Sequence, residues 1–251
     1  MNIRTVEQLI DREHHAWEEL LDLFRNGSNA YQVLPADPEA ARSTLIGLQV
    51  STRSYLGAVA YETGGILIDE GWIRLLGSGA NGIYGSLSSW NGLSGDSGDN
   101  DPSDSNVLRR ETPDSNTGGT GALSPAMDIP VLPGMMVVAY DAAGGFFAFN
   151  TGRFGSDGHI YYWAPDCLEW ESTELTYSEF ITWLAEGDLS LFYKTFRWEG
   201  WVENTKRLQP EQIHAYYPPL WSQEGDGNSS STSPAPVLEA WKATVDATVN
   251  K

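Results

Sequence analysis

Apolar residues recur at helical spacing near the start of the chain. Thr5 and Gln8 fit the capping-box pattern, and the apolar positions that follow keep a period of 3.6 as far as Phe24. The pair Asn26-Gly27 predicts the end of this helix. A second helix is predicted to begin at Asp37-Pro38, because Asp is a good N-cap and Pro at the first helical position loses no hydrogen bond.

Short β-prone runs replace the helical pattern further along. The runs "GILID" and "WIRLL" flank a break at residues 69–71 and predict a hairpin. Four later runs, "MMVVAY", "GFFAFN", "HIYYWA" and "LEWEST", are separated by short links. Because parallel strands need long crossovers, these links predict an antiparallel meander. Thr176 with Glu179 forms another capping box, so a helix should follow the strands.

The stretch "YDAAGGFFAFN", residues 140–150, joins two of these runs. Asp141 and Gly144-Gly145 are typical of a tight turn, in which Gly adopts backbone angles that other residues avoid. Phe147 and Phe149 alternate with Phe146, so the strand after the turn carries aromatic rings on both faces. We therefore expect it to be a central strand that is covered on each side.

Two segments lack the large apolar residues that a packed core needs. Residues 94–122 are dominated by Gly, Ser, Asp, Asn and Pro, which predicts a flexible acidic insertion. Residues 222–236 resemble a low-complexity linker to a C-terminal amphipathic helix near Val237 to Val249. The prediction is a single α+β domain over residues 1–251, with an antiparallel β-sheet packed by helices.

The net charge of the chain restricts the classes of partner that we expect it to bind. The net charge of −19 repels nucleic-acid phosphates and anionic lipid, and it would attract a basic protein or a cationic ligand. The alternative is that the acidity only maintains solubility. No apolar run reaches the length of a membrane helix and the N-terminus has no apolar signal core, so we expect a soluble cytoplasmic protein.

The sequence gives little support for a metal or cofactor site. The lone Cys167 cannot form an intramolecular disulfide or a Cys-based zinc site, and the four histidines show no metal-binding spacing. No phosphate-binding or dinucleotide-binding glycine motif and no nucleophile elbow occurs. We therefore predict no cofactor, no metal and no assigned catalytic residue.

Paired carboxylates leave a hydrolase open as an alternative. Six acids lie at or near the ends of the candidate strands: Glu62, Asp69, Asp141, Asp157, Asp166 and Glu169. A glycosidase needs two carboxylates across a cleft, and aromatic rings such as Trp163 could stack on a sugar. Asp is also the ordinary residue of turns, which explains the same positions without catalysis.

Several segments together resemble a bacterial family, domain of unknown function 2625. They are "VLPAD", "AYETGGILIDEGWIRLLGSG", "GMMVVAYDAAGGFFAFN", "GHIYYWAPDCLEWEST", "LTYSEFITWLAEGD" and "YYPPLW". The second half more distantly resembles the Smi1/Knr4 (SUKH) superfamily, through Gly144-Gly145, the Phe-rich strand and the helix with Tyr177 to Trp183. That resemblance implies an antiparallel sheet packed by helices and, for many members, an immunity protein that neutralises a toxin.

We therefore expect a non-enzymatic protein-binding module, an immunity protein for a basic toxin being the specific form of this hypothesis. The binding residues predicted from positions at strand ends are Asp141, Asp157, Trp163, Asp166 and Glu169. A hydrolase acting on a carbohydrate or cationic substrate, and a small-ligand or peptide-binding protein, are the alternatives. The sequence makes no prediction of the oligomeric state.

Overall fold

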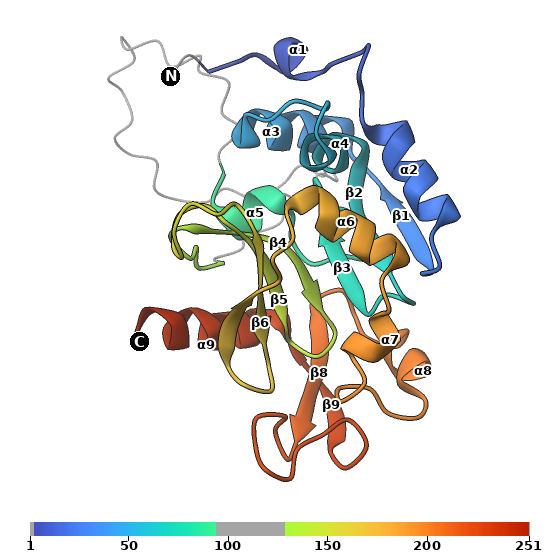
Figure 1. The fold of residues 1–251 in the computed structure, drawn as a ribbon, viewed down its shortest axis with the longest axis vertical. Helices are drawn as coiled ribbons and strands as arrows, with labels where there is room; N and C mark the ends of the chain where they lie inside the picture. The colour runs from blue at the N-terminus through green and yellow to red at the C-terminus, as the bar shows by residue number, and fades with distance from the viewer. Residues whose placement is uncertain (1–2, 94–128, 251) are drawn as a thin grey trace, which may run out of the picture.

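The computed structural model describes residues 3–93 and 129–250, and an antiparallel sheet organises this part of the chain (Figure 1). In the described residues the sheet has seven strands in sequential order, and each strand pairs antiparallel with the next. The strands are β1 (Tyr31–Pro35), β2 (Thr63–Ile68), β3 (Ile73–Leu76), β4 (Met135–Asp141), β5 (Phe146–Asn150), β6 (Ile160–Ala164) and β7 (Glu169–Ser172). The predicted α+β class, the β2–β3 hairpin and the meander from β4 to β7 are confirmed.

Helices and a two-stranded ribbon surround the sheet. The ribbon pairs β8 (Gln212–Tyr217) with β9 (Ser231–Pro236), and Figure 1 shows it extending beyond one end of the sheet. The helices are α1 (Val6–Leu9), α2 (Trp17–Asn26), α3 (Pro38–Leu48), α4 (Tyr55–Glu62), α5 (Leu87–Asn91), α6 (Tyr177–Glu186), α7 (Leu189–Phe192), α8 (Trp201–Thr205) and α9 (Val237–Val249).

Strand β5 is covered on both faces, as its alternating aromatic residues predict. On one face Phe147 packs against Phe180 of α6, with ring centroids 5.0 Å apart. On the other face Phe146 packs against Trp241 of α9, with ring centroids 4.9 Å apart. Both phenylalanines are fully buried, so β5 lies in the middle layer of the core.

The N-terminal helical pattern is interrupted in the structure. Thr5 and Gln8 form the predicted capping box, but α1 ends at Leu9 and α2 begins at Trp17. The Asp11 carboxylate accepts hydrogen bonds from the backbone N–H groups of Glu13 and His14, a local arrangement that competes with helix formation. The single helix expected to run to Phe24 is therefore two helices.

The interpretation of residues 222–236 as a linker missed a strand. Residues 231–236, "STSPAP", form β9 and pair along the whole length of β8. Their small polar side chains and two prolines give no apolar alternation, and such residues are tolerated in an edge strand. The C-terminal helix is confirmed as α9. The predicted insertion at residues 94–122 lies outside the described residues.

Within residues 3–93 and 129–250, none of the helices combines the length and the apolar character that a bilayer crossing requires.

Candidate functional site

The five predicted binding residues lie at different ends of the sheet. In an antiparallel meander, the β2–β3, β4–β5 and β6–β7 connections share one end, which we call the ribbon end because β8 packs there. Asp141 ends β4, Asp166 lies between β6 and β7, and Glu169 begins β7, so all three belong to the ribbon end. Asp157 lies in the β5–β6 loop at the opposite end of the sheet.

Asp141 is completely buried inside the β4–β5 turn. Its Oδ1 accepts hydrogen bonds from the backbone N–H groups of Ala143 and Gly145, at 2.9 and 2.8 Å. Burial raises the pKa of Asp141 above its ordinary value, although the four hydrogen bonds that it accepts oppose the rise. Because the side chain is 0% exposed, a partner cannot touch it on the folded protein.

Two tyrosines complete the surroundings of Asp141. Tyr162 on β6 and Tyr193 after α7 donate hydrogen bonds to its Oδ2, at 2.7 and 3.1 Å. Burial raises the pKa values of both hydroxyls well above normal, so both remain protonated donors. Gly145 is needed beside this network, because a Cβ there would lie 2.3 Å from the Tyr162 hydroxyl. Asp141 therefore fastens the turn to β6 and to the segment after α7.

Asp157 organises the β5–β6 loop. Its carboxylate accepts hydrogen bonds from the Asn150 side chain at 2.8 Å and from the Tyr161 hydroxyl at 2.8 Å. These bonds, led by the one from Asn150, lower the pKa of Asp157. The residue is exposed, but it does not share a surface patch with the ribbon-end residues.

An arginine in an aromatic box was missed by the sequence analysis. The Arg197 guanidinium lies over the rings of Trp201, Trp72 and Tyr193, with distances to the ring centroids of 4.0, 4.7 and 4.8 Å. Its Nη2 pairs with Asp69 Oδ2 at 2.6 Å. Arg197 is only 8% exposed, so this pair is a buried, cation–π-stabilised contact between the β2–β3 turn and the segment before α8. The motif "FRWEGW" contains Arg197 and Trp201 of this box, but not the distant Trp72 and Asp69.

His214 on β8 is the buried histidine of the ribbon end. Its Nε2 lies 3.2 Å from the Thr205 hydroxyl, and its ring stacks on Trp72. Burial, assisted by the positive charge of Arg74, lowers the pKa of His214 to about 4. The imidazole is therefore neutral at physiological pH and connects β8 to the sheet by packing.

An apolar cleft of about 420 Å³ lies at the base of the ribbon. Its walls come from α9, from β8 and β9, and from the connection between β6 and β7. The wall residues include Trp163, Pro165, Leu168, Trp221, Glu239 and Ala243. Trp163 is itself buried, whereas the neighbouring residues Asp166 and Glu169 are exposed beside this wall. Of the five predicted residues, Trp163 lines this cleft, and Asp166 and Glu169 are its neighbours along the chain.

Aromatic side chains project from the ribbon close to the cleft. Tyr217 ends β8 and is 78% exposed, and Trp221 in the following loop is 58% exposed. Exposed apolar surface that is continuous with an apolar cleft is typical of an interaction site. The loop that follows also carries Glu224 and Asp226, so the exposed rings have acidic neighbours.

Three of the six carboxylates considered for a hydrolase have local partners. Glu62 lies 3.1 Å from His15 Nε2, Asp69 pairs with Arg197, and Asp141 is enclosed by hydrogen bonds. In the part of the chain that the structure describes, no group of three or more His, Cys, Asp and Glu residues could hold a metal ion.

Taken together, the sheet, the ribbon and the cleft define an acidic α+β protein with an apolar, aromatic surface site. The chain belongs to the family described as "Protein of unknown function DUF2625", whose model matches residues 6–240. This match confirms the family resemblance expected from the sequence.

Two relatives extend the comparison. The chain is 33% identical over 241 residues to "Putative uncharacterized protein YbfG" of Escherichia coli (strain K12), a match that covers 96% of this chain and 95% of that protein. It is 33% identical over 219 residues to an "Uncharacterized protein" of Haemophilus influenzae (strain ATCC 51907 / DSM 11121 / KW20 / Rd), covering 87% of this chain and 83% of that protein. No solved structure matches the chain.

Proposed function

We propose that this protein is a non-enzymatic protein-binding module that binds a basic partner through the cleft and the β8–β9 ribbon. The observation that carries the proposal is the exposure of Trp221, which lines an apolar cleft of about 420 Å³, together with that of Tyr217 at the end of β8. Tyr and Trp are enriched among the residues that contribute most binding energy at interfaces, because they bury much area and keep a polar atom.

Charge supports a basic partner. Glu239 lines the cleft, and the exposed residues Asp166 and Glu169 are sequence neighbours of Pro165 and Leu168, which also line it. A basic chain approaching a protein of net charge −19 gains electrostatic steering, while the apolar cleft supplies the area that water leaves on binding. An apolar centre with a charged rim is the ordinary anatomy of a protein interface.

The resemblance of the second half of the chain to the Smi1/Knr4 superfamily supports a more specific form of the proposal. In that form the protein is an immunity protein, and the partner is a basic toxin domain. A nuclease presents a positively charged substrate groove, which an acidic inhibitor occupies rapidly.

The test compares partner capture by three forms of the full chain in cells of the source organism. They are the wild type, the double variant Tyr217→Ala/Trp221→Ala, and Phe154→Ala as a matched control. Phe154 is also exposed, but it lies in the β5–β6 loop at the other end of the sheet. Proteins captured with each form are quantified by mass spectrometry, and the partner is then purified for direct titration.

We expect a partner of high isoelectric point whose affinity falls at least about tenfold in the double variant and stays unchanged in the control. Equal affinity of all three forms for that partner would remove the ribbon from the binding site. An acidic partner would contradict the electrostatic part of the proposal. Protection of the source cell from the partner's toxicity would support the immunity form, and absence of any toxicity would argue against it.

A further inference from the structure

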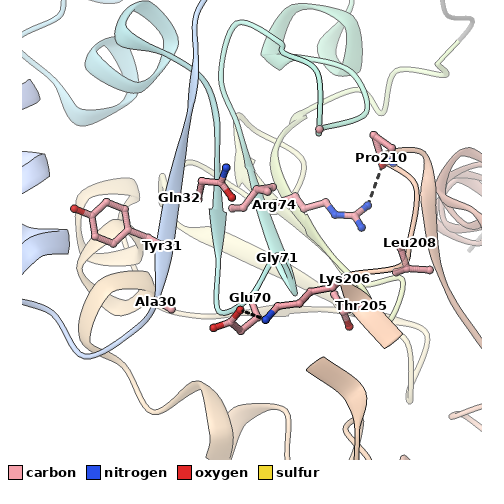
Figure 2. A pocket seen from close by; sticks show the side chains of 12 residues that line it. Ala30, Tyr31, Gln32, Glu70, Gly71, Arg74, Thr205, Lys206, Leu208 and Pro210 are labelled. Atoms are coloured by element: carbon pink, nitrogen blue, oxygen red, sulfur yellow. Dashed lines mark hydrogen bonds and ion pairs between the residues drawn. The ribbon is translucent and has the colours of Figure 1, made fainter. Parts of the chain in front are cut away.

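A second pocket, of about 490 Å³, lies where β1, β2 and β3 meet the segment between α8 and β8 (Figure 2). Its size falls in the range of small-molecule sites. Its lining joins apolar residues with a few polar groups, among them Gln32, Leu67, Glu70, Arg74, Lys206 and Leu208. This pocket is separate from the cleft at the base of the ribbon, and none of its lining residues is shared with that cleft.

The strand register explains why the side chains of Gln32, Leu67 and Arg74 face the same space. Gln32 pairs with Leu67, Leu67 pairs with Arg74, and Arg74 pairs with Tyr140. Directly paired residues of an antiparallel sheet project from the same face. The four side chains therefore form one row across β1, β2, β3 and β4, and the row places a guanidinium on the wall of the pocket.

Arg74 is the unusual member of this row because it is only 4% exposed. Its Nη1 donates to the carbonyl oxygens of Pro210 at 2.9 Å and Gln212 at 2.8 Å, and its guanidinium carbon lies 5.5 Å from the centre of the Tyr140 ring. A guanidinium has five N–H donors, and both of these bonds use the same nitrogen. Figure 2 shows the other terminal nitrogen pointing away from Pro210.

No carboxylate in residues 3–93 or 129–250 forms an ion pair with Arg74. Taking a cation out of water is costly, so buried arginines normally have an anionic partner. The two carbonyls provide only partial negative charges. The positive charge of Arg74 also extends beyond its own contacts, since it contributes to the lowered pKa of His214.

The mouth of the pocket carries a second cation. Lys206 Nζ pairs with Glu70 Oε2 at 2.9 Å, and both side chains are partly exposed (Figure 2). Exposed pairs of this kind contribute little to stability and exchange easily. Lys206 can therefore turn to an incoming anion while Glu70 returns to water. The apolar part of the lining, with Leu67 and Leu208, suits a short hydrocarbon or aromatic body.

We propose that this pocket binds a small organic anion, a carboxylate with a short apolar body, whose charged end meets Arg74 and Lys206. A guanidinium recognises a planar carboxylate through paired hydrogen bonds. This inference goes beyond the proposed protein binding, because it concerns a different pocket and a ligand of opposite charge.

The test measures binding of defined probes to the full chain by calorimetry and thermal shift. The carboxylates are benzoate and hexanoate, the phosphates are inorganic phosphate and phenyl phosphate, and benzylamine is the cationic counterpart. We expect benzoate or hexanoate to bind with a Kd of about 1 mM or lower, and benzylamine not to bind. Tighter binding of either phosphate would overturn the assignment to a carboxylate, and no binding of any anion at about 10 mM would overturn the site.

Two variants locate the binding. Arg74→Gln should abolish it, and Gln32→Glu should weaken it about tenfold by adding a negative charge beside the pocket. Gln32 is exposed, so its variant tests the site even if Arg74→Gln fails to fold. Gln223→Glu makes the same change at an exposed position on the ribbon loop and should leave binding unchanged. Equal weakening by both Glu variants would overturn the proposal, because it would indicate a general charge effect.

Discussion

Asp141 illustrates how one buried side chain joins segments that are distant in the sequence. It lies in a turn, where Asp is common, but its carboxylate also receives hydrogen bonds from Tyr162 and Tyr193. A buried carboxylate is tolerated only when its oxygens have donors. Here two backbone groups and two hydroxyls supply them, so the residue stabilises the ribbon end and is not available to a partner.

Replacement of Asp141 tests this structural role. Asp141→Ala leaves two backbone N–H groups and two tyrosine hydroxyls without their acceptor, and should lower the free energy of unfolding by about 3 kcal/mol. Asp141→Asn keeps an acceptor oxygen of the same shape and should cost clearly less. Urea unfolding monitored by tryptophan fluorescence provides the measurement. Equal costs for the two variants would show that the hydrogen bonds do not stabilise the turn.

His214 predicts a pH dependence of stability with a defined sign. Its folded-state pKa of about 4 is below the ordinary value of 6.5, so the unfolded chain binds the proton more readily. Stability from this group is therefore complete above pH 6.5 and is lost as the pH falls toward 4. The loss is at most about 3 kcal/mol, from about 1.4 kcal/mol per pKa unit.

The measurement is the free energy of unfolding between pH 7 and pH 4 for three proteins. His214→Gln should lack the part of the slope that this histidine causes, and its stability should fall less than that of the wild type. His14→Gln is the control, because the His14 side chain is 60% exposed. Parallel pH profiles for the wild type and His214→Gln would contradict the assignment.

At the scale of elements, a helix or strand can be predicted when its residue pattern differs clearly from that of the residues beside it. Strands β4 to β7 and helix α6 were predicted because aromatic runs, turn residues and a capping box mark their limits. Helix α4 lacks such contrast, because its buried positions include the small residues Gly57, Ala58 and Ala60 around Val59. Strand β9 has the opposite problem, since its small polar residues resemble a linker.

The candidate site was predictable only in part for a related reason. Trp163 lines the cleft, and Asp166 and Glu169 are near it in sequence, because all three belong to β6, β7 and their connection. The other walls come from α9 and from the ribbon, whose place against β6 depends on tertiary packing. The pocket around Arg74 needs the register of three strands, which local patterns do not contain.

Helix α6 offers a direct test of the capping pattern read from the sequence. The Thr176 hydroxyl accepts from the backbone N–H of Glu179, and the Glu179 carboxylate accepts from that of Thr176. Thr176→Ala should lower the free energy of unfolding by about 1 kcal/mol. Thr182→Ala, at a half-buried position inside the same helix, should cost clearly less, because Ala is the better helix former. Equal destabilisation by both changes, measured by urea unfolding, would show that the cap is not the cause.

At the scale of the whole molecule, one layered core carries both the ribbon with the two pockets and an acidic exterior. Helices α6 and α9 enclose the aromatic strand β5, and this core carries the ribbon and both pockets. Acidic residues cover much of the exterior and give the net charge of −19. The like charges repel one another in the folded state, and together they attract a basic partner. Salt should therefore stabilise the fold and weaken binding.

Salt therefore provides the last prediction. Raising NaCl from about 10 mM to about 500 mM shortens the screening length from about 30 Å to less than 8 Å. Reduced self-repulsion should raise the Tm by about 2–4 °C, which corresponds to about 1 kcal/mol for a domain of this size. The same salt should weaken association with a basic partner, mainly through a slower on-rate. The variant Glu199→Lys/Glu224→Lys changes the net charge from −19 to −15 at two exposed positions, and should show a smaller gain in Tm. A Tm that falls with salt, or a rise in Tm that is equal in the wild type and the variant, would mean that repulsion between like charges does not limit the stability of the fold.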